Sequence, residues 1–178
     1  NMMFYQGAAA AERVFGVIDT KPDIRENDSS PALNINQSHI EFKNVSFTYP
    51  KTDAEAIKNI NISIDGGTTT ALVGHSGAGK STVINLLPRF YDPNKGQIFI
   101  DGQNICDVTL SSLRKNISLV SQDIILFDDT VHANIAYANL NASNEQIKKA
   151  CDFAAATDFI EKLPQSYETI IGENGIRL

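Results

Sequence analysis

Residues 74–82 read Gly74-His75-Ser76-Gly77-Ala78-Gly79-Lys80-Ser81-Thr82 and fit the pattern G-x-x-x-x-G-K-[ST]. The glycines let the backbone curl so that successive N–H groups point at one anion. We expect the Lys80 ammonium to reach the outer phosphates of a bound nucleotide and the Ser81 hydroxyl to bind Mg²⁺. The stretch therefore predicts a phosphate-binding loop. The alternative is a glycine-rich turn between a strand and a helix that holds no ligand.

The segments on either side of this loop favour a strand–loop–helix arrangement. Residues 69–73 (Thr-Thr-Ala-Leu-Val) predict a strand that enters the loop, and residues 82–87 (Thr-Val-Ile-Asn-Leu-Leu) predict a helix that leaves it. A helix that begins here directs the positive end of its dipole at the anion. The predicted fold class is therefore α/β with a P-loop nucleotidase core.

An antiparallel β subdomain is predicted around this core. Apolar residues fall at even positions over residues 40–42 and at odd positions over residues 45–49. We therefore expect a single strand with an irregularity at residues 43–44. Residues 60–64 (Ile-Asn-Ile-Ser-Ile) predict a half-buried strand that ends in an Asp-Gly-Gly turn. Residues 97–102 (Gln-Ile-Phe-Ile-Asp-Gly) indicate another hairpin.

The rest of the chain is mainly helical in pattern, apart from one strand over residues 117–120 that runs into Gln122. Ser143 is expected to cap a helix, with Gln146 at the third helical position. The helices are predicted at residues 110–115, 131–137, 143–156 and 158–163.

Three parts are expected along the chain: a helix over residues 1–18, a linker over residues 19–37 and a domain over residues 38–178. The helix is predicted from apolar residues at steps of three and four, and the linker from its Pro, Asn, Asp and Ser content. The helix is either an ordinary surface helix or the end of a longer helix. We expect the chain to be a segment of a longer protein.

Composition excludes several classes of function. The 178 residues are 42% hydrophobic and 20% charged, as in ordinary globular proteins, and the formal net charge of -6 argues against a nucleic-acid partner. Cys106 and Cys151 lack the spacing of a metal site, and their isolation favours a reducing compartment. The sequence contains no run of about 18 or more apolar residues, so no membrane span is predicted.

Several motifs, taken in order, resemble the nucleotide-binding domain of ATP-binding cassette (ABC) exporters, of the bacterial lipid A flippase and multidrug exporter type. Residues 47–50 (Phe-Thr-Tyr-Pro) resemble the aromatic loop that stacks on adenine, and residues 74–82 match the Walker A motif. Residues 119–122 (Leu-Val-Ser-Gln) resemble the Q-loop. The resemblance spans the whole chain.

Three further segments extend the resemblance. Residues 129–135 (Asp-Thr-Val-His-Ala-Asn-Ile) resemble the start of the exporters' helical subdomain. Residues 171–175 (Ile-Gly-Glu-Asn-Gly) are similar to the X-loop that precedes the signature motif, so Leu178 is expected to lie just before the signature or at its first residue. Residues 1–18 resemble the cytosolic end of the last membrane helix.

The resemblance implies ATP and Mg²⁺ as cofactors. It makes Tyr49, together with residues 74–82, the nucleotide contacts, Lys80 and Gln122 the catalytic residues, and Ser81 and Gln122 the Mg²⁺ ligands. Each residue has a plainer interpretation as well. Tyr49 continues a core face, Gln122 is a polar residue at a strand end, and Glu173 is a loop carboxylate. Arg89 and Lys95 are expected to be surface charges.

The implied function is that of an ATPase domain that energises export of a lipid or another hydrophobic substrate, at the cytoplasmic face of the inner membrane. The implied partners are the protein's own transmembrane domain, contacted near Gln122 and Glu173, and a second nucleotide-binding domain in a homo- or heterodimer. Because the Walker B and signature motifs do not occur in these residues, we expect this chain alone to bind nucleotide without turnover. The alternative is a soluble ABC ATPase or another P-loop NTPase, such as a small-molecule kinase.

Overall fold

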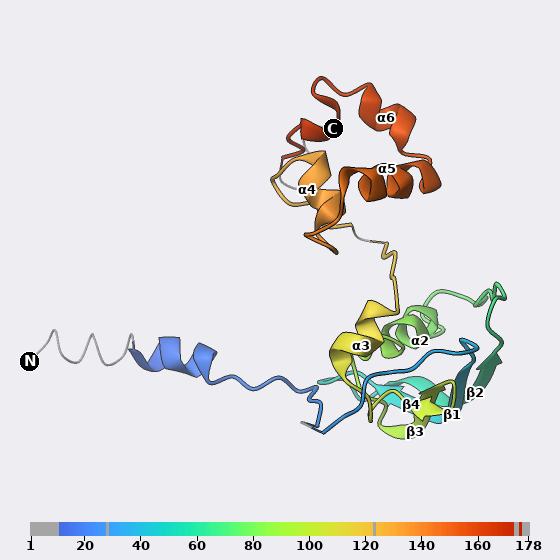
Figure 1. The fold of residues 1–178 in the computed structure, drawn as a ribbon. Helices are drawn as coiled ribbons and strands as arrows, with labels where there is room; N and C mark the ends of the chain where they lie inside the picture. The colour runs from blue at the N-terminus through green and yellow to red at the C-terminus, as the bar shows by residue number, and fades with distance from the viewer. Residues whose placement is uncertain (1–10, 28, 123, 173–174, 176–178) are drawn as a thin grey trace, which may run out of the picture. The chain divides into compact units, whose positions relative to one another are not determined.

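The computed structural model describes residues 11–27, 29–122, 124–172 and 175. The chain divides into two compact units, Asn1–Ser118 and Leu119–Leu178, and each is described here by itself (Figure 1). Residues 11–18 are helical, in agreement with the predicted N-terminal helix, whose first ten residues lie outside the described ranges. Within those ranges, none of the helices has both the length and the apolar character needed to span a bilayer.

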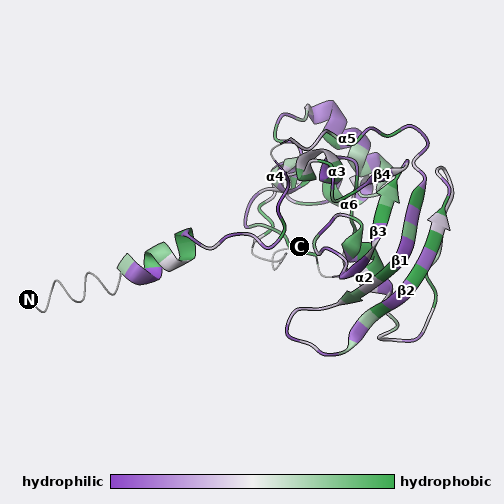
Figure 2. Cartoon of the chain, turned by 90° about the horizontal axis from the view of Figure 1, so that it is seen from below, coloured by the Kyte–Doolittle hydropathy of each residue, from purple (hydrophilic) through white to green (hydrophobic). Residues whose placement is uncertain are grey.

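A four-stranded antiparallel sheet in the order β2-β1-β3-β4 forms the centre of the first unit. It confirms the predicted antiparallel subdomain and the hairpin predicted at residues 97–102, whereas the Asp-Gly-Gly turn after residue 64 leads into no strand. Figure 2 shows polar and apolar residues alternating along β2, as expected of a strand with one buried face. The strands are β1 (Ile40–Thr48), β2 (Glu55–Ile64), β3 (Lys95–Ile100) and β4 (Gln103–Asn104).

The irregularity predicted in the first strand is present in β1. Phe42 pairs with Ile62 of β2 and Ile98 of β3, and the register then shifts between Phe42 and Val45. A bulge of this kind changes which face the following side chains point to. Val45 and Phe47 are therefore buried on the same face as Phe42, although a regular strand would place them on the opposite face.

Gly96 faces this bulge from β3 and explains how the two backbones approach each other so closely. A Cβ atom at this position would lie 2.4 Å from the carbonyl oxygens of both Lys43 and Asn44, and its φ of +79° is in the left-handed region. Only glycine combines that conformation with that separation at low cost. The bulge in β1 and the glycine in β3 therefore depend on each other.

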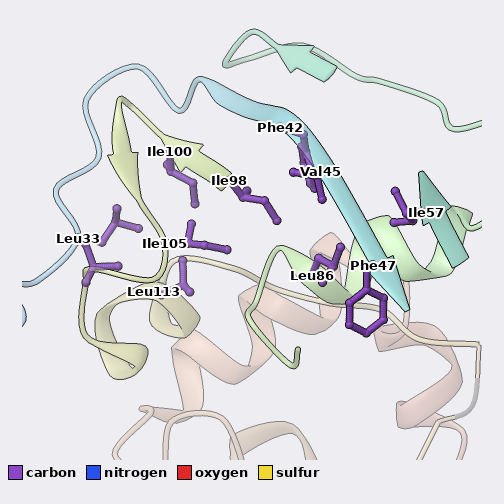
Figure 3. Close-up of a cluster of buried hydrophobic side chains, with 11 residues drawn as sticks. Leu33, Phe42, Val45, Phe47, Ile57, Leu86, Ile98, Ile100, Ile105 and Leu113 are labelled. Carbon is purple, nitrogen blue, oxygen red and sulfur yellow. The ribbon is translucent and has the colours of Figure 1, made fainter. Parts of the chain in front are cut away.

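Two helices cover one face of the sheet, α2 (Lys80–Leu86) and α3 (Leu110–Lys115) (Figure 1). Both were predicted within two residues of their observed bounds. Leu86 of α2 and Leu113 of α3 are completely buried in the same cluster as the sheet residues (Figure 3). The cluster consists of Leu33, Phe42, Val45, Phe47, Ile57, Leu86, Ile98, Ile100, Ile105, Val108 and Leu113.

Two strand predictions are wrong. Residues 69–73 and residues 117–120 form no strand. A strand needs hydrogen bonds to a neighbouring strand, and neither run pairs with another segment of the described chain. Val73 is 92% exposed and Val120 is 91% exposed, so these two apolar side chains are uncovered, whereas Ile117 is half-buried against the core cluster.

The end of the predicted linker is attached to the first unit. Leu33 is buried in the core cluster, and its backbone N–H donates to the Ser112 hydroxyl at 2.8 Å. Earlier in the linker, the Glu26 carboxylate accepts the Leu110 N–H at 2.5 Å, at the first residue of α3. A carboxylate at this end of a helix satisfies an amide that has no partner inside the helix. Sequence reasoning did not predict these contacts.

Asp101, in the turn between β3 and β4, fixes residues 36–39, where the predicted linker joins the domain. Its carboxylate accepts four successive backbone N–H groups, at distances between 2.7 and 3.1 Å. These hydrogen bonds favour the ionised form and lower the pKa of Asp101 to about 2. The donors are Asn36, Gln37, Ser38 and His39.

Arg89 is buried, so the prediction of a surface charge at this position is wrong; the same prediction for Lys95, which is exposed, is confirmed. The Arg89 guanidinium donates from Nε and Nη2 to the two oxygens of Asp92, at 2.6 and 3.1 Å. It also donates to the carbonyls of Cys106 and Arg25, at 3.2 and 3.0 Å. The hydrogen bond to Asp92 raises the pKa of Arg89 above its usual value. A buried guanidinium is tolerated here because its donors find acceptors.

In its described residues, the second unit contains three short helices, a 3₁₀ turn at Ser166–Glu168 and its own buried cluster. The predicted helix cap is confirmed: the Ser143 hydroxyl accepts the Gln146 N–H, and the Gln146 side chain accepts the Ser143 N–H at 2.8 Å. Each predicted helix of this unit is present but shorter than expected. The helices are α4 (Val131–Ala136), α5 (Asn144–Phe153) and α6 (Thr157–Glu161).

Candidate functional site

The loop at residues 74–79 leads directly into the first turn of α2. It is mostly exposed, and it closes on itself through a hydrogen bond from the Ala78 N–H to the His75 carbonyl at 3.2 Å. In the described part of the chain, the N–H groups of Gly79, Lys80 and Ser81 donate to no acceptor. Amides at the start of a helix that have no partner of their own are suited to bind an anion.

Gly79 sets the position of this loop on the sheet. Its φ is +83°, and a Cβ atom here would lie 2.5 Å from the Ala56 carbonyl oxygen of β2. The backbone of the loop therefore contacts the backbone of β2 at a distance that excludes any side chain. This explains why the pattern requires glycine immediately before Lys80.

The Lys80 ammonium lies over the first residues of the loop. Its Nζ donates to the carbonyl oxygens of Gly74 and His75, at 2.9 and 2.8 Å. The neighbouring Ser81 side chain is exposed, and both residues line an open pocket of about 430 Å³. A cation, free amides and a hydroxyl within three residues are suited to a phosphate group and its Mg²⁺ ion. The predicted roles of these residues in binding phosphate and Mg²⁺ stay predictions.

Tyr49 follows the end of β1 and belongs to a cluster of three aromatic rings. Its ring packs edge-to-face against Phe47, with centroids 4.9 Å apart, and against Tyr91, with centroids 5.2 Å apart. Its hydroxyl donates to the Thr82 hydroxyl of α2 at 3.1 Å. An open pocket of about 470 Å³ lies beside this cluster and is lined also by Pro50.

Thr82 faces Tyr49, in contrast to the exposed Ser81 beside it. Thr82 is only 5% exposed, on the same buried side of α2 as Leu86. Sequence reasoning missed this contact, although the spacing of four between Thr82 and Leu86 places the two residues on one helix face. That spacing could have predicted that Thr82 points toward the core.

The remaining predicted site residues are placed as follows. His75 and Ser76 are exposed in the loop, and the His75 Nδ1 lies 2.8 Å from the Ser76 carbonyl oxygen. Gln122 is an exposed residue of the second unit, and its predicted role in catalysis stays a prediction. Glu173 lies outside the described residues, so its predicted contact with a membrane domain also stays a prediction.

The sequence pattern of the ABC transporter family matches residues 57–176. The chain belongs to the ABC transporter family. This confirms the resemblance to ABC exporters and the predicted α/β fold class. The match extends through both units of the chain, from β2 to the residues after the last helix.

Several curated proteins of the ABC family are similar over the full length of this chain. The ATP-dependent lipid A-core flippase of Syntrophus aciditrophicus (strain SB) is 48% identical over 178 residues, which cover 100% of this chain and 29% of that protein. The flippase of the same name from Escherichia coli (strain K12) is 44% identical over 179 residues, covering 100% and 30%. This chain therefore spans about 30% of the length of the relatives that it matches.

A solved structure supports the same grouping. A bacterial Atm1-family ABC exporter with ATP bound superposes with a TM-score of 0.92 at 43% sequence identity. The match covers 98% of this chain and 30% of that exporter.

Proposed function

We propose that this chain is a nucleotide-binding domain that binds Mg-ATP through residues 74–82 and Tyr49, within an ABC exporter that hydrolyses ATP. The observation that carries the proposal is the start of α2, where three amides without an acceptor among the described residues lie beside the Lys80 ammonium at one exposed loop. The family membership and the likeness to an exporter with ATP bound give further support.

Each residue has a defined task in this proposal. Lys80 and the amides at residues 79–81 bind the negatively charged phosphates, and Tyr49 stacks on the base. Ser81 and Gln122 would hold Mg²⁺, which when bound neutralises charge on the outer phosphates. Phosphoryl transfer needs positioning and charge neutralisation more than covalent chemistry, and these residues supply both. Gln122 would also orient the attacking water.

The proposed setting is the cytoplasmic face of the inner membrane, in a transporter that moves a lipid or another hydrophobic substrate. The names of the curated relatives favour a lipid. A helix at residues 11–18 followed by an attached linker is consistent with a connection to membrane helices. We propose that the Gln122 and Glu173 regions contact the transmembrane domain, and that a second nucleotide-binding domain, identical or different, completes the ATP site.

The test is Mg-ATP binding and phosphate release by the full-length protein. Lys80→Ala removes a charge-assisted contact to phosphate and should weaken binding by roughly a hundredfold. Lys58→Ala, which removes an exposed lysine of β2, is the matched control and should leave both measurements unchanged. Gln122→Ala should lower turnover more than binding. ATP affinity that is unchanged by Lys80→Ala would refute the proposed site.

A further inference from the structure

Residues 89–92 follow α2 and contact the linker through one residue and the Tyr49 ring through another. The Arg89 guanidinium donates from Nη2 to the Arg25 carbonyl oxygen of the linker at 3.0 Å. The Tyr91 ring packs edge-to-face against Tyr49, with centroids 5.2 Å apart and an interplanar angle of 86°. Because the two contacts start from positions only two residues apart, a change at one is expected to affect the other.

This segment is fixed firmly to the end of α2. Arg89 is only 4% exposed and has a φ of +55°, a backbone conformation that a residue with a side chain keeps only where its surroundings hold it there. The Arg114 side chain donates to the carbonyl oxygens of Pro88 and Arg89, at 3.0 and 2.9 Å. The Phe90 N–H donates to the Asn85 carbonyl of α2 at 3.2 Å. Strained residues of this kind occur often at functional sites.

The linker contacts this segment at more than one point. Asp23 and the half-buried Ile24 line the open pocket of about 470 Å³ that is also lined by Tyr49 and Tyr91. The next linker residue is Arg25, whose side chain is exposed although its carbonyl oxygen accepts from the buried guanidinium. The linker and the ring on which a base would stack therefore border the same pocket.

We propose that Arg89 and Tyr91 are positioning residues that couple the linker to the base end of the nucleotide site. A base that stacks on Tyr49 holds the Tyr91 ring in place, and residues 89–92 transmit this order to the hydrogen bond at the Arg25 carbonyl. This inference rests on the proposed function. Coupling between two sites is reciprocal, so an attached linker also favours binding of the base by the same factor.

Trypsin can report this contact directly in the full-length protein. The carbonyl that accepts from Arg89 belongs to the bond that trypsin cleaves between Arg25 and Glu26, so cleavage requires a local opening that releases it. Mass spectrometry follows the cleavage rate without ligand, with a non-hydrolysable ATP analogue and with tripolyphosphate. Tripolyphosphate carries the charge of the nucleotide but has no base.

The ATP analogue should slow cleavage after Arg25 about fivefold in the unmodified protein, and tripolyphosphate should slow it less than about twofold. Tyr91→Leu keeps an apolar side chain but removes the ring. This variant should leave cleavage without ligand unchanged and should reduce the protection by the ATP analogue to less than about twofold. Tyr91→Phe keeps the ring and should retain the full protection. A role of Tyr91 in stability alone would not remove the effect of the ligand.

Arg89→Lys tests the other side of the coupling. It keeps the charge, but one ammonium cannot span Asp92 and two carbonyls as the guanidinium fork does, so cleavage after Arg25 without ligand should rise about fivefold. Cleavage after the exposed Lys162 of the second unit shows whether the variant is unfolded. If both bonds are cleaved faster by the same factor, Arg89→Lys has lost its fold and Tyr91→Leu decides alone.

The control is Phe90→Leu, the same kind of change at the neighbouring position. The Phe90 ring lies 5.6 Å from the Arg114 guanidinium carbon, measured from the ring centroid. Loss of this ring should leave cleavage after Arg25 and its protection by the ATP analogue as they are in the unmodified protein.

Three results would overturn the inference. Equal protection by tripolyphosphate and the ATP analogue would show that the phosphate loop and α2 carry the effect. Full protection in Tyr91→Leu would show that the ring contact does not transmit it. Unchanged cleavage in a folded Arg89→Lys variant would show that the guanidinium does not hold the linker. If the unmodified protein binds ATP and Lys80→Ala does not, each of these results removes this inference and leaves the proposed function intact.

Discussion

The two ends of the proposed nucleotide site are built on different principles. The phosphate end, at residues 74–81, consists of backbone amides and one ammonium, and most of it is exposed. The aromatic end, around Tyr49, consists of side chains packed against one another and against the core cluster. The first end owes its shape to glycine backbone angles and the second to packing. Each should therefore respond to a different kind of change.

The difference follows from what each end has to bind. Amides that bind an anion cannot be covered by other side chains, so the loop has few contacts that would hold it in place. The contact of Gly79 with β2 supplies this support through the backbone. A flat base needs only a fixed ring, and Phe47 and Tyr91 can fix Tyr49 without covering the pocket beside it.

The largest effect is expected from Gly79→Ala. The added methyl group would clash with the Ala56 carbonyl oxygen, and the fold would hold the alanine at a positive φ. The free energy of unfolding should therefore fall by about 3 kcal/mol. Gly67→Ala is the control, because its φ is +71° but no atom lies within 4 Å of the added methyl group. Gly67→Ala should lower the free energy of unfolding by only about 1 kcal/mol. Denaturant unfolding measures both values, and equal losses would show that the contact with β2 is unimportant.

An intermediate effect is expected from salt, because salt screens charges and leaves stacking unaffected. Raising ionic strength from about 0.1 M to 1 M shortens the screening length from about 10 Å to 3 Å. Tripolyphosphate should bind the full-length protein roughly tenfold more weakly at the higher salt concentration, because the phosphate end is exposed. Adenosine, which reaches only the aromatic end, should change less than about twofold. Equal salt dependence of the two ligands would contradict the division into two ends.

The smallest effect is expected at Asp101, where amides also surround an anion, but the anion is the protein's own carboxylate. Because the folded pKa of about 2 lies below the usual 3.8, this carboxylate stabilises the fold above about pH 4, and the contribution is lost as pH falls toward 2. Asp101→Asn should therefore lower the melting temperature at neutral pH, and the difference from the unmodified protein should shrink on acidification. Asp53→Asn, at an exposed carboxylate before β2, is the control. A difference that is independent of pH would contradict this assignment.

Local sequence patterns were sufficient for much of the fold. The change of parity between Phe42 and Val45 predicted the bulge, and Ser143 with Gln146 predicted the helix cap. These features depend on neighbours in sequence, which a pattern can report. The fold class and the family resemblance were also predicted and are confirmed.

Features that depend on distant partners were not predictable in the same way. The runs at residues 69–73 and 117–120 have strand composition, but a strand also requires a pairing neighbour. Arg89 is a charged residue whose burial depends on Asp92 and on two carbonyls that no local pattern indicates. In the candidate site, the loop motif was evident from the sequence, whereas the contact between Tyr49 and Thr82 joins segments 33 residues apart.

The attachment of the linker has a practical consequence for dissecting this protein. A domain excised to start at His39 would lose Leu33 from its core and would leave the Asp101 carboxylate with one of its four amide partners. A domain that starts before Arg25 would keep these contacts and the carbonyl that accepts from Arg89. In a hydrogen-exchange measurement, we expect the amides of residues 36–39 to exchange slowly and those of residues 19–24 to exchange fast. The position at which exchange becomes slow marks where the folded domain begins.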